Sequence, residues 1–238
     1  IEQHLRFGTK ATSSHLRTVL TNFIPVFAGR GVVQFSAYVD SVLATLVSGG
    51  AVSILGFAQV ITMLPVSLFG MSVSAAELAD MSRERGNPEA IAAVIRARLH
   101  EGLRRIAFYV VPSAVAFLVL GDVVGGALYQ SGQFTRESSV WLWGVLAGSS
   151  VGLVASTLGR LYASTWYSLR NTRTPFAFAA VRVGLTTGLG YIAALWLPGW
   201  LGVSARWGVA GLTASAGIAA SVEFVLLRRS LARRIGPT

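Results

Sequence analysis

The chain has 238 residues, of which 53% are hydrophobic and only 13% charged, and its net charge is +10. Soluble domains carry about 25% charged residues, so this composition argues against a water-soluble enzyme and excludes intrinsic disorder. Cysteine is absent and the three histidines are far apart, which excludes disulfides and leaves no zinc-ligand spacing. The composition therefore predicts an all-α integral membrane protein.

Residues 1–18 are expected to form a cytoplasmic lead-in, and residues 228–238 a basic cytoplasmic tail. Between them, six apolar stretches are long enough to cross a hydrocarbon core of about 30 Å. The predicted spans are residues 19–47, 51–78, 106–128, 140–162, 176–197 and 207–227. Prolines inside the spans should kink or break them locally. Because the chain begins at Ile1 and not at methionine, we expect it to be a piece of a longer protein.

The polar stretch between the second and third spans predicts an interfacial amphipathic helix that leads into the third span. Asn87, Pro88 and Glu89 follow the order of a helix cap, a first-turn proline and an acid near the helix N-terminus. Apolar residues then recur with a helical period, and arginines occupy other positions. The alternative is a short solvated helix in a cytoplasmic loop.

The distribution of basic residues predicts the orientation in the membrane. Of the twenty Lys and Arg residues, fifteen fall on one side of the six alternating spans and two on the other. By the positive-inside rule, both ends of the chain should be cytoplasmic. Basic residues beside apolar spans favour anionic phospholipids as partners, and not nucleic acid.

Four segments, in a consistent order, carry recognisable combinations of residues. They are VDSVLAT at 39–45, LPVSLFG at 64–70, LYQSGQFT at 128–135 and YSLRNTRTP at 167–175. Together they resemble motifs of the MurJ/MviN family, and the fourth is the best match, to that family's Tyr…Asp-Thr-Arg-Thr-Pro loop. The resemblance extends over about residues 19–227.

This resemblance implies a lipid II flippase of the multidrug/oligosaccharidyl-lipid/polysaccharide exporter superfamily, in the bacterial inner membrane. Such proteins have two six-helix lobes that alternate access to a central cavity, and this chain resembles the second lobe alone. The implied partners are lipid II, or a similar polyprenyl-pyrophosphate glycolipid, and the missing first lobe. The implied protein is a transporter and not an enzyme. It needs no cofactor beyond a sodium ion or the membrane potential for coupling.

The sequence departs from the family pattern at two places. Val60 stands where the family commonly has an arginine in the second span. The family's sodium site, where present, uses an aspartate that Asp40 matches, whereas Thr186 and Gly190 stand where Asn and Asp would be. Asp40 and Thr186 are therefore the candidate ion-coupling residues. The alternative role for Asp40 is hydrogen bonding at a helix end or between helices.

Among the candidate substrate-binding residues, Arg30 has the predicted position that lies deepest in the membrane. It lies about 11 residues into the first span, roughly 16 Å along the helix. Burying arginine there costs about 2.5 kcal/mol or more, so it should face a cavity or a partner. We expect Arg30, Gln34 and Arg173 to bind the pyrophosphate, whose oxygens match the guanidinium donors. The alternatives for Arg30 are a structural ion pair or a helix that begins later.

The remaining charges inside the spans are expected to have structural roles. Arg182 and Glu223 should form an ion pair between the fifth and sixth spans, and Glu77 and Arg160 should reach the inner interface. Two other functions stay open. One is export of another polyprenyl-linked oligosaccharide or of a small cation. The other is a non-transporting membrane scaffold of cell-wall assembly.

Overall fold

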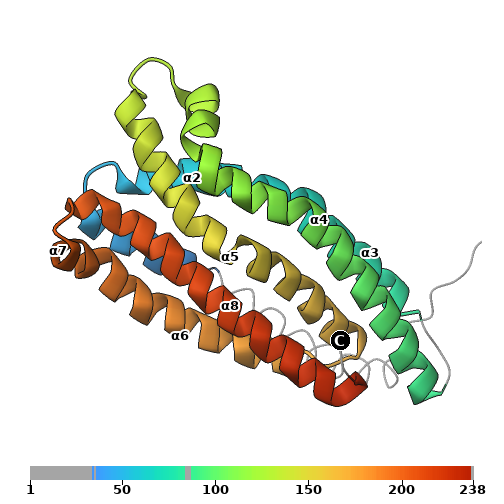
Figure 1. Ribbon diagram of the computed structural model, residues 1–238. Helices are drawn as coiled ribbons and strands as arrows, with labels where there is room; N and C mark the ends of the chain where they lie inside the picture. The colour runs from blue at the N-terminus through green and yellow to red at the C-terminus, as the bar shows by residue number, and fades with distance from the viewer. Residues whose placement is uncertain (1–33, 35, 84–86, 237–238) are drawn as a thin grey trace, which may run out of the picture.

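The computed structural model describes residues 34, 36–83 and 87–236, and every regular element in this part of the chain is helical. The elements are the helix Ser36–Val47, α2 (Ala51–Pro65), the π-helix η1 (Val66–Met71), α3 (Ser72–Met81), α4 (Pro88–Tyr129), α5 (Arg136–Ser168), α6 (Arg173–Leu195), α7 (Leu197–Leu201), the 3₁₀-helix η2 (Ala205–Trp207) and α8 (Gly208–Ile235). Figure 1 shows an elongated bundle in which α5 lies between α4 and α8, with α6 beside α8.

Five helical segments of the described chain are long and apolar enough to cross a membrane: Ala51–Met81, Glu89–Tyr129, Arg136–Ser168, Arg173–Leu195 and Ala205–Ile235. They correspond to the second to sixth predicted spans, so the prediction of an all-α, multi-pass membrane protein is confirmed. Of the first predicted span, the structure describes Gln34 and the apolar helix Ser36–Val47. The other residues of this span lie outside the described residues. The count of six spans therefore stays a prediction.

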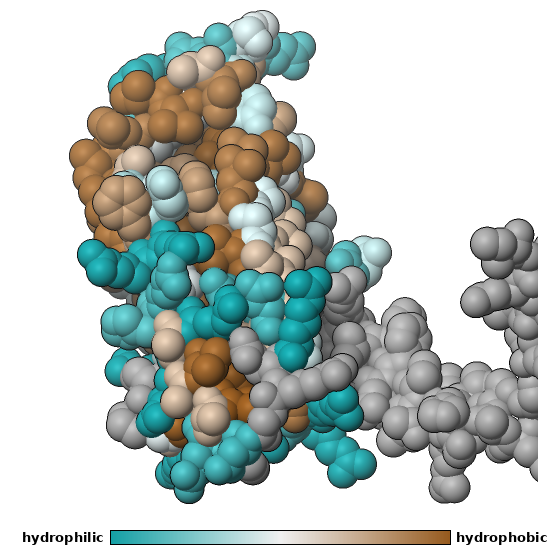
Figure 2. All heavy atoms as spheres, turned by 90° about the vertical axis from the view of Figure 1, so that its right-hand side faces the viewer, coloured by the Kyte–Doolittle hydropathy of each residue, from teal (hydrophilic) through white to brown (hydrophobic). Residues whose placement is uncertain are grey.

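The surface has the distribution of side chains that a bilayer requires. Figure 2 shows a hydrophobic surface between hydrophilic surfaces at the top and in the lower half of the molecule. Large apolar side chains that the protein leaves exposed are concentrated on α2, η1 and α4: Val60, Met63, Leu64, Leu68, Met71, Phe108, Val115, Leu118, Val119 and Val123. So many exposed large apolar side chains are unusual for a soluble monomer and normal against lipid or another protein segment.

The predicted amphipathic helix is not a separate element. Residues 88–129 form the single 42-residue helix α4, whose N-terminus has the predicted cap, with Asn87 Oδ1 accepting from the Glu89 backbone N–H. Ile95 and Leu99, on the apolar face, are 1% and 0% exposed in the protein core. An apolar stripe has the same period whether it meets lipid or protein, and these two residues meet protein; the interfacial position of the helix stays a prediction.

The basic tail is also part of a helix. α8 continues through Arg228 to Ile235, and its last turns bury Leu231 and Ile235 against the protein. The guanidinium of Arg234 lies 5.3 Å from the ring centroid of Trp166 on α5, a cation–π contact. The predicted end of the sixth span at residue 227 thus marks a change in composition and not the end of the helix.

Small residues let α8 approach its neighbours closely. A Cβ atom added at Gly152 of α5 would lie only 2.2 Å from the Cα of Gly217 on α8, and one at Gly208 would lie 2.1 Å from the Ala194 carbonyl oxygen at the end of α6. The Thr213 hydroxyl donates to the Val145 carbonyl across the α5–α8 contact, at 3.0 Å. Close backbone packing and interhelical hydrogen bonds are the main sources of helix association in lipid.

The predicted prolines behave differently in the two described spans that contain them. α2 ends at Pro65, and the next six residues form the π-helix η1 before α3 begins at Ser72. Pro112, in contrast, lies inside α4, which continues as one helix on both sides. The second span is therefore interrupted by a change of helix type, whereas the third is not interrupted.

Candidate functional site

The predicted substrate-binding residues lie in different parts of the described chain. Arg30 lies outside the described residues. Gln34 is helical and exposed, and Arg173 is exposed at the first position of α6. Asn171 caps this helix, because its Oδ1 accepts from the Thr174 backbone N–H at 3.1 Å. Within the described chain, no hydrogen bond or ion pair joins Gln34 to Arg173.

Four charged side chains from four helices form an intramembrane charge cluster: Asp40, Arg160, Arg182 and Glu223. Arg182 Nη1 donates to Glu223 Oε2 at 3.1 Å, which joins α6 to α8, and the two side chains are 28% and 15% exposed. Arg160 of α5 interacts electrostatically with both members of this pair. Asp40, on the helix Ser36–Val47, interacts with Arg182. The structure thus forms the predicted Arg182–Glu223 pair and places it in a larger group.

The candidate ion-coupling residues lie where three helices meet. Thr186 is buried on α6, one turn beyond Arg182. One turn further, a Cβ atom added at Gly190 would lie 3.7 Å from Leu43 and 3.3 Å from Ser215 Oγ. Gly190 thus allows the helix Ser36–Val47 and α8 to pack against α6 at this level. Asp40 Oδ1 is buried and has no hydrogen-bond partner among the described residues.

Of these three positions, Asp40 alone supplies a carboxylate. Hard cations are held by several oxygen ligands, with carboxylates supplying the charge. The described chain contains no group of three or more His, Asp or Glu side chains that could hold a metal ion. Thr186 contributes a neutral hydroxyl and Gly190 contributes no side chain, so sodium coupling at Asp40 stays a prediction.

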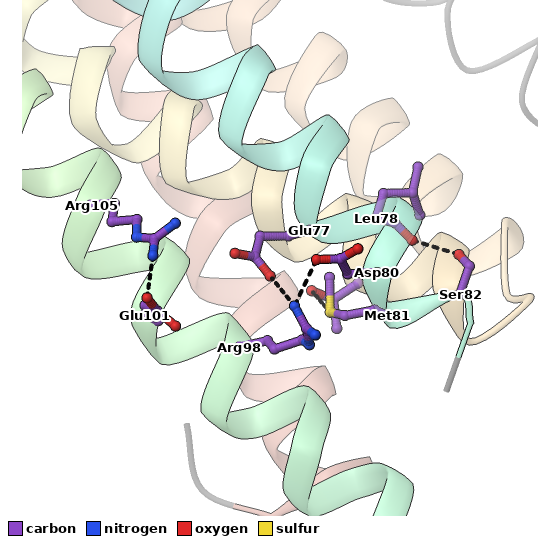
Figure 3. Close-up of polar contacts among 9 residues, drawn as sticks. Glu77, Leu78, Asp80, Met81, Ser82, Arg98, Glu101 and Arg105 are labelled. Atoms are coloured by element: carbon purple, nitrogen blue, oxygen red, sulfur yellow. Dashed lines mark hydrogen bonds and ion pairs between the residues drawn. The ribbon is translucent and has the colours of Figure 1, made fainter. Parts of the chain in front are cut away.

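A second charged group joins α3 to α4, as Figure 3 shows. Arg98 Nη1 of α4 lies 2.8 Å from Asp80 Oδ2 and 3.8 Å from Glu77 Oε2, both on α3. Glu77 is only 7% exposed, so the expectation that it reaches the membrane interface was wrong. The Glu77 side chain packs against Gly102, where a Cβ atom would lie 3.4 Å from Glu77 Cγ. Two acids at spacing i, i+3 are the sequence signal that could have predicted this shared partner.

Replacing Arg98 with methionine should lower the melting temperature of the purified protein by several degrees. The change leaves the buried Glu77 carboxylate without its nearest cation, but Arg98 and Asp80 are themselves 36% and 45% exposed, so the cost should be about 1–2 kcal/mol. The matched control is Arg105→Met, which breaks the exposed pair with Glu101 on the same helix and should cost at most about 0.5 kcal/mol. Equal melting temperatures for the two variants would contradict the role assigned to Arg98.

Aromatic residues at the α4–α5 connection form a pocket that the sequence did not predict. Phe57 of α2 contacts Tyr129 and Phe134, with ring centroids 4.7 and 5.5 Å away. Ser131 and Gln133 complete the polar part of a cavity of about 460 Å³. Four of these residues, all except Phe57, belong to the LYQSGQFT segment, so this segment anchors the α4–α5 connection against the second span.

The apolar spans and the charges paired between them define a multi-pass α-helical membrane protein. A family model described as lipid II flippase MurJ matches residues 2–238. The chain therefore belongs to the MurJ lipid II flippase family, whose members are multi-pass proteins of the bacterial inner membrane.

Similar proteins and a similar solved structure cover this chain almost completely. The chain is 26% identical to a probable lipid II flippase MurJ of Bdellovibrio bacteriovorus, over 89% of this chain and 38% of that protein. It is also 26% identical to the lipid II flippase MurJ of Burkholderia cenocepacia, over 92% of this chain and 40% of that protein. It thus spans about two fifths of the length of these relatives. A lipid II flippase MurJ in an inward closed conformation has the same fold, with a TM-score of 0.75 and 24% identity over 97% of this chain and 45% of that one.

Proposed function

We propose that this chain is one six-helix lobe of a protein that moves lipid II across the bacterial inner membrane by alternating access. The observation that carries the proposal is the family match over residues 2–238. The share of the relatives that the chain spans is compatible with one lobe of two, with the other lobe supplied by the rest of the protein. A flippase breaks and forms no covalent bond in its substrate, so we propose a transport cycle and no catalytic residue.

In this proposal, Arg30, Gln34 and Arg173 bind the pyrophosphate and its attached sugars. Arg173 is exposed at the start of α6, at the end of the bundle proposed to be cytoplasmic, where lipid II would enter. A guanidinium presents several N–H donors in a fixed plane and forms charge-assisted hydrogen bonds with phosphate oxygens. Basic residues at the same end, including those of the last turns of α8, would contact anionic phospholipids.

A complementation experiment tests the proposal. The full reading frame that contains this chain should restore growth to a bacterium depleted of its own lipid II flippase. Loss of one charged hydrogen bond costs about tenfold or more in affinity, so Arg173→Gln should rescue less well. The control is Arg136→Gln, which removes a side chain that is 71% exposed at the other end of the bundle and should rescue fully.

Membrane insertion of each variant must be measured alongside growth. If the unchanged protein is inserted at normal levels and growth is not restored, lipid II is not its substrate. If Arg173→Gln and Arg136→Gln rescue equally, Arg173 does not contact the headgroup.

A further inference from the structure

The connection between α6 and α8 leaves large apolar side chains exposed at one end of the bundle, where Figure 1 shows α7. Trp196 and Trp200 are 55% and 74% exposed, and their rings meet edge to face with centroids 6.5 Å apart. Leu197 and Leu201, each one residue further on, are 37% and 65% exposed, whereas Pro198 is buried. These four exposed side chains form the α7 face, which is left open in the described part of the chain.

The connection that carries the α7 face has no charge. Residues 195–205 contain no acidic or basic side chain, and residues 199–205 are all exposed. The α4–α5 connection at the same end of the bundle is different, because Ser131, Gln133 and Thr135 make it polar and Arg136 follows directly. Side chains exposed to water are mostly polar or charged. The composition of the two connections therefore indicates different surroundings.

The indole N–H groups also distinguish α7 from the neighbouring helix α5. Trp141 and Trp143 each donate from Nε1 to a backbone carbonyl of the protein, at 2.9 and 2.8 Å. Trp196 and Trp200 make no such hydrogen bond to the described residues. Tryptophan is enriched where a membrane meets water, because its ring is apolar while its N–H can bond to headgroups or water.

The backbone of this connection forms its own hydrogen bonds. The Trp200 N–H donates to the Trp196 carbonyl at 3.2 Å, and the Val203 N–H donates to the Pro198 carbonyl at 3.0 Å. Gly202, with a φ of +66°, supplies the left-handed residue that this closure requires. A segment that satisfies its backbone groups internally can leave bulk water at lower cost than an open loop.

We propose that α7 lies at the boundary between phospholipid headgroups and acyl chains, with the α7 face inserted among the lipids. The face directly follows Tyr191 and Ile192, which are exposed at the end of the α6 span, so the surface that meets lipid continues from α6 onto α7. The partner is therefore a phospholipid interface and not a second protein segment. This inference concerns how the lobe is seated in the bilayer, so it does not rest on the identity of the transported lipid.

Single cysteines test the proposal, because this chain has none of its own. A nitroxide spin label is attached to the variant Leu201→Cys or to the control Ser131→Cys, in full-length protein reconstituted into phospholipid vesicles, with any cysteine elsewhere replaced by serine. Oxygen concentrates in the bilayer, so it should relax the label at position 201 several-fold more than a water-soluble nickel complex does. The order should be reversed at position 131, in the polar connection.

Two results of this experiment would overturn the proposal. If the nickel complex reaches the label at position 201 as readily as the label at position 131, α7 lies in water. If neither oxygen nor the nickel complex reaches position 201, another protein segment covers the α7 face.

Fluorescence quenching provides a second measurement that needs no cysteine. Brominated phospholipids quench tryptophans that contact their acyl chains, so the unchanged protein is compared with the double variant Trp196→Phe, Trp200→Phe. Both side chains are exposed, so phenylalanine should leave the fold intact. We expect the double variant to lose part of the quenchable fluorescence, and an equal quenched fraction in both proteins would contradict the proposal. Because neither measurement uses lipid II, failure of the complementation experiment would leave these results unaffected.

Discussion

Replacing Gly152 with alanine should destabilise the protein more than any other single methyl addition to α5. The new Cβ atom would lie 2.2 Å from the Cα of Gly217, so the backbones of α5 and α8 would have to separate. Overpacking of this kind costs about 1–3 kcal/mol when side chains can move, and the obstacle here is backbone. We expect a loss at or above the upper end of this range, measured as a lower melting temperature and a lower yield of monodisperse protein.

The matched control for this variant is Gly188→Ala on α6, where an added Cβ atom would meet nothing within 4 Å. Alanine there removes the flexibility of glycine in a helix and should stabilise the protein by about 0.5–1 kcal/mol. If Gly152→Ala lowers the melting temperature and Gly188→Ala raises it, the close approach of α5 and α8, and not helix propensity, determines the effect of Gly152→Ala. A Gly152→Ala protein as stable as the control would show that the two helices do not touch.

Replacing Glu223 with leucine should be the most damaging change to a single charge in the bundle. Arg182 would keep its positive charge inside the membrane without its hydrogen-bond acceptor, at a cost of about 2.5 kcal/mol or more. The measurement is again the melting temperature of the full-length protein. Because the pair is 28% and 15% exposed, water relieves part of this cost, so the loss should be smaller than for a fully buried pair.

The double variant Arg182→Met, Glu223→Leu separates the stability lost with the ion pair itself from the stability lost when one charge is left without a partner. Two apolar side chains of similar size should recover most of the stability that Glu223→Leu loses, since a buried pair often contributes little net stability. If the double variant is no more stable than the single variant, the effect comes from packing around Glu223 and not from the unpaired guanidinium.

Most of the architecture could be predicted from the sequence because the membrane limits the possibilities. Hydropathy located the second to sixth spans, and the cap at Asn87 located the start of α4. The Arg182–Glu223 pair was predictable because two opposite charges at similar depth in neighbouring helices have few other partners. These features depend on local composition or on the depth of a residue in the membrane, and both can be estimated from the sequence.

The features that the sequence did not predict depend on which surface each helix face meets. Apolar periodicity at Ile95 and Leu99 is the same against lipid and against protein, so the sequence alone did not show that these two side chains pack inside the protein. The burial of Glu77 depends on Arg98 and on the absence of a side chain at Gly102, two residues of the next helix. Such contacts follow from helix packing, which no local pattern encodes.

The π-helical turn in the second span has a consequence for insertions and deletions. A π-helix bonds residue i to i+5, so it contains about one residue more than an α-helical turn of similar rise. Removing one residue between Val66 and Met71 would let the segment revert to α-helix and leave the angular phase of α3 nearly unchanged. The same deletion in the α-helical part of the span would rotate α3 by roughly 100° and turn Glu77 and Asp80 away from Arg98. The π-helix is therefore the one segment of this span where the loss of a residue would be absorbed without rotating the inner part of the helix.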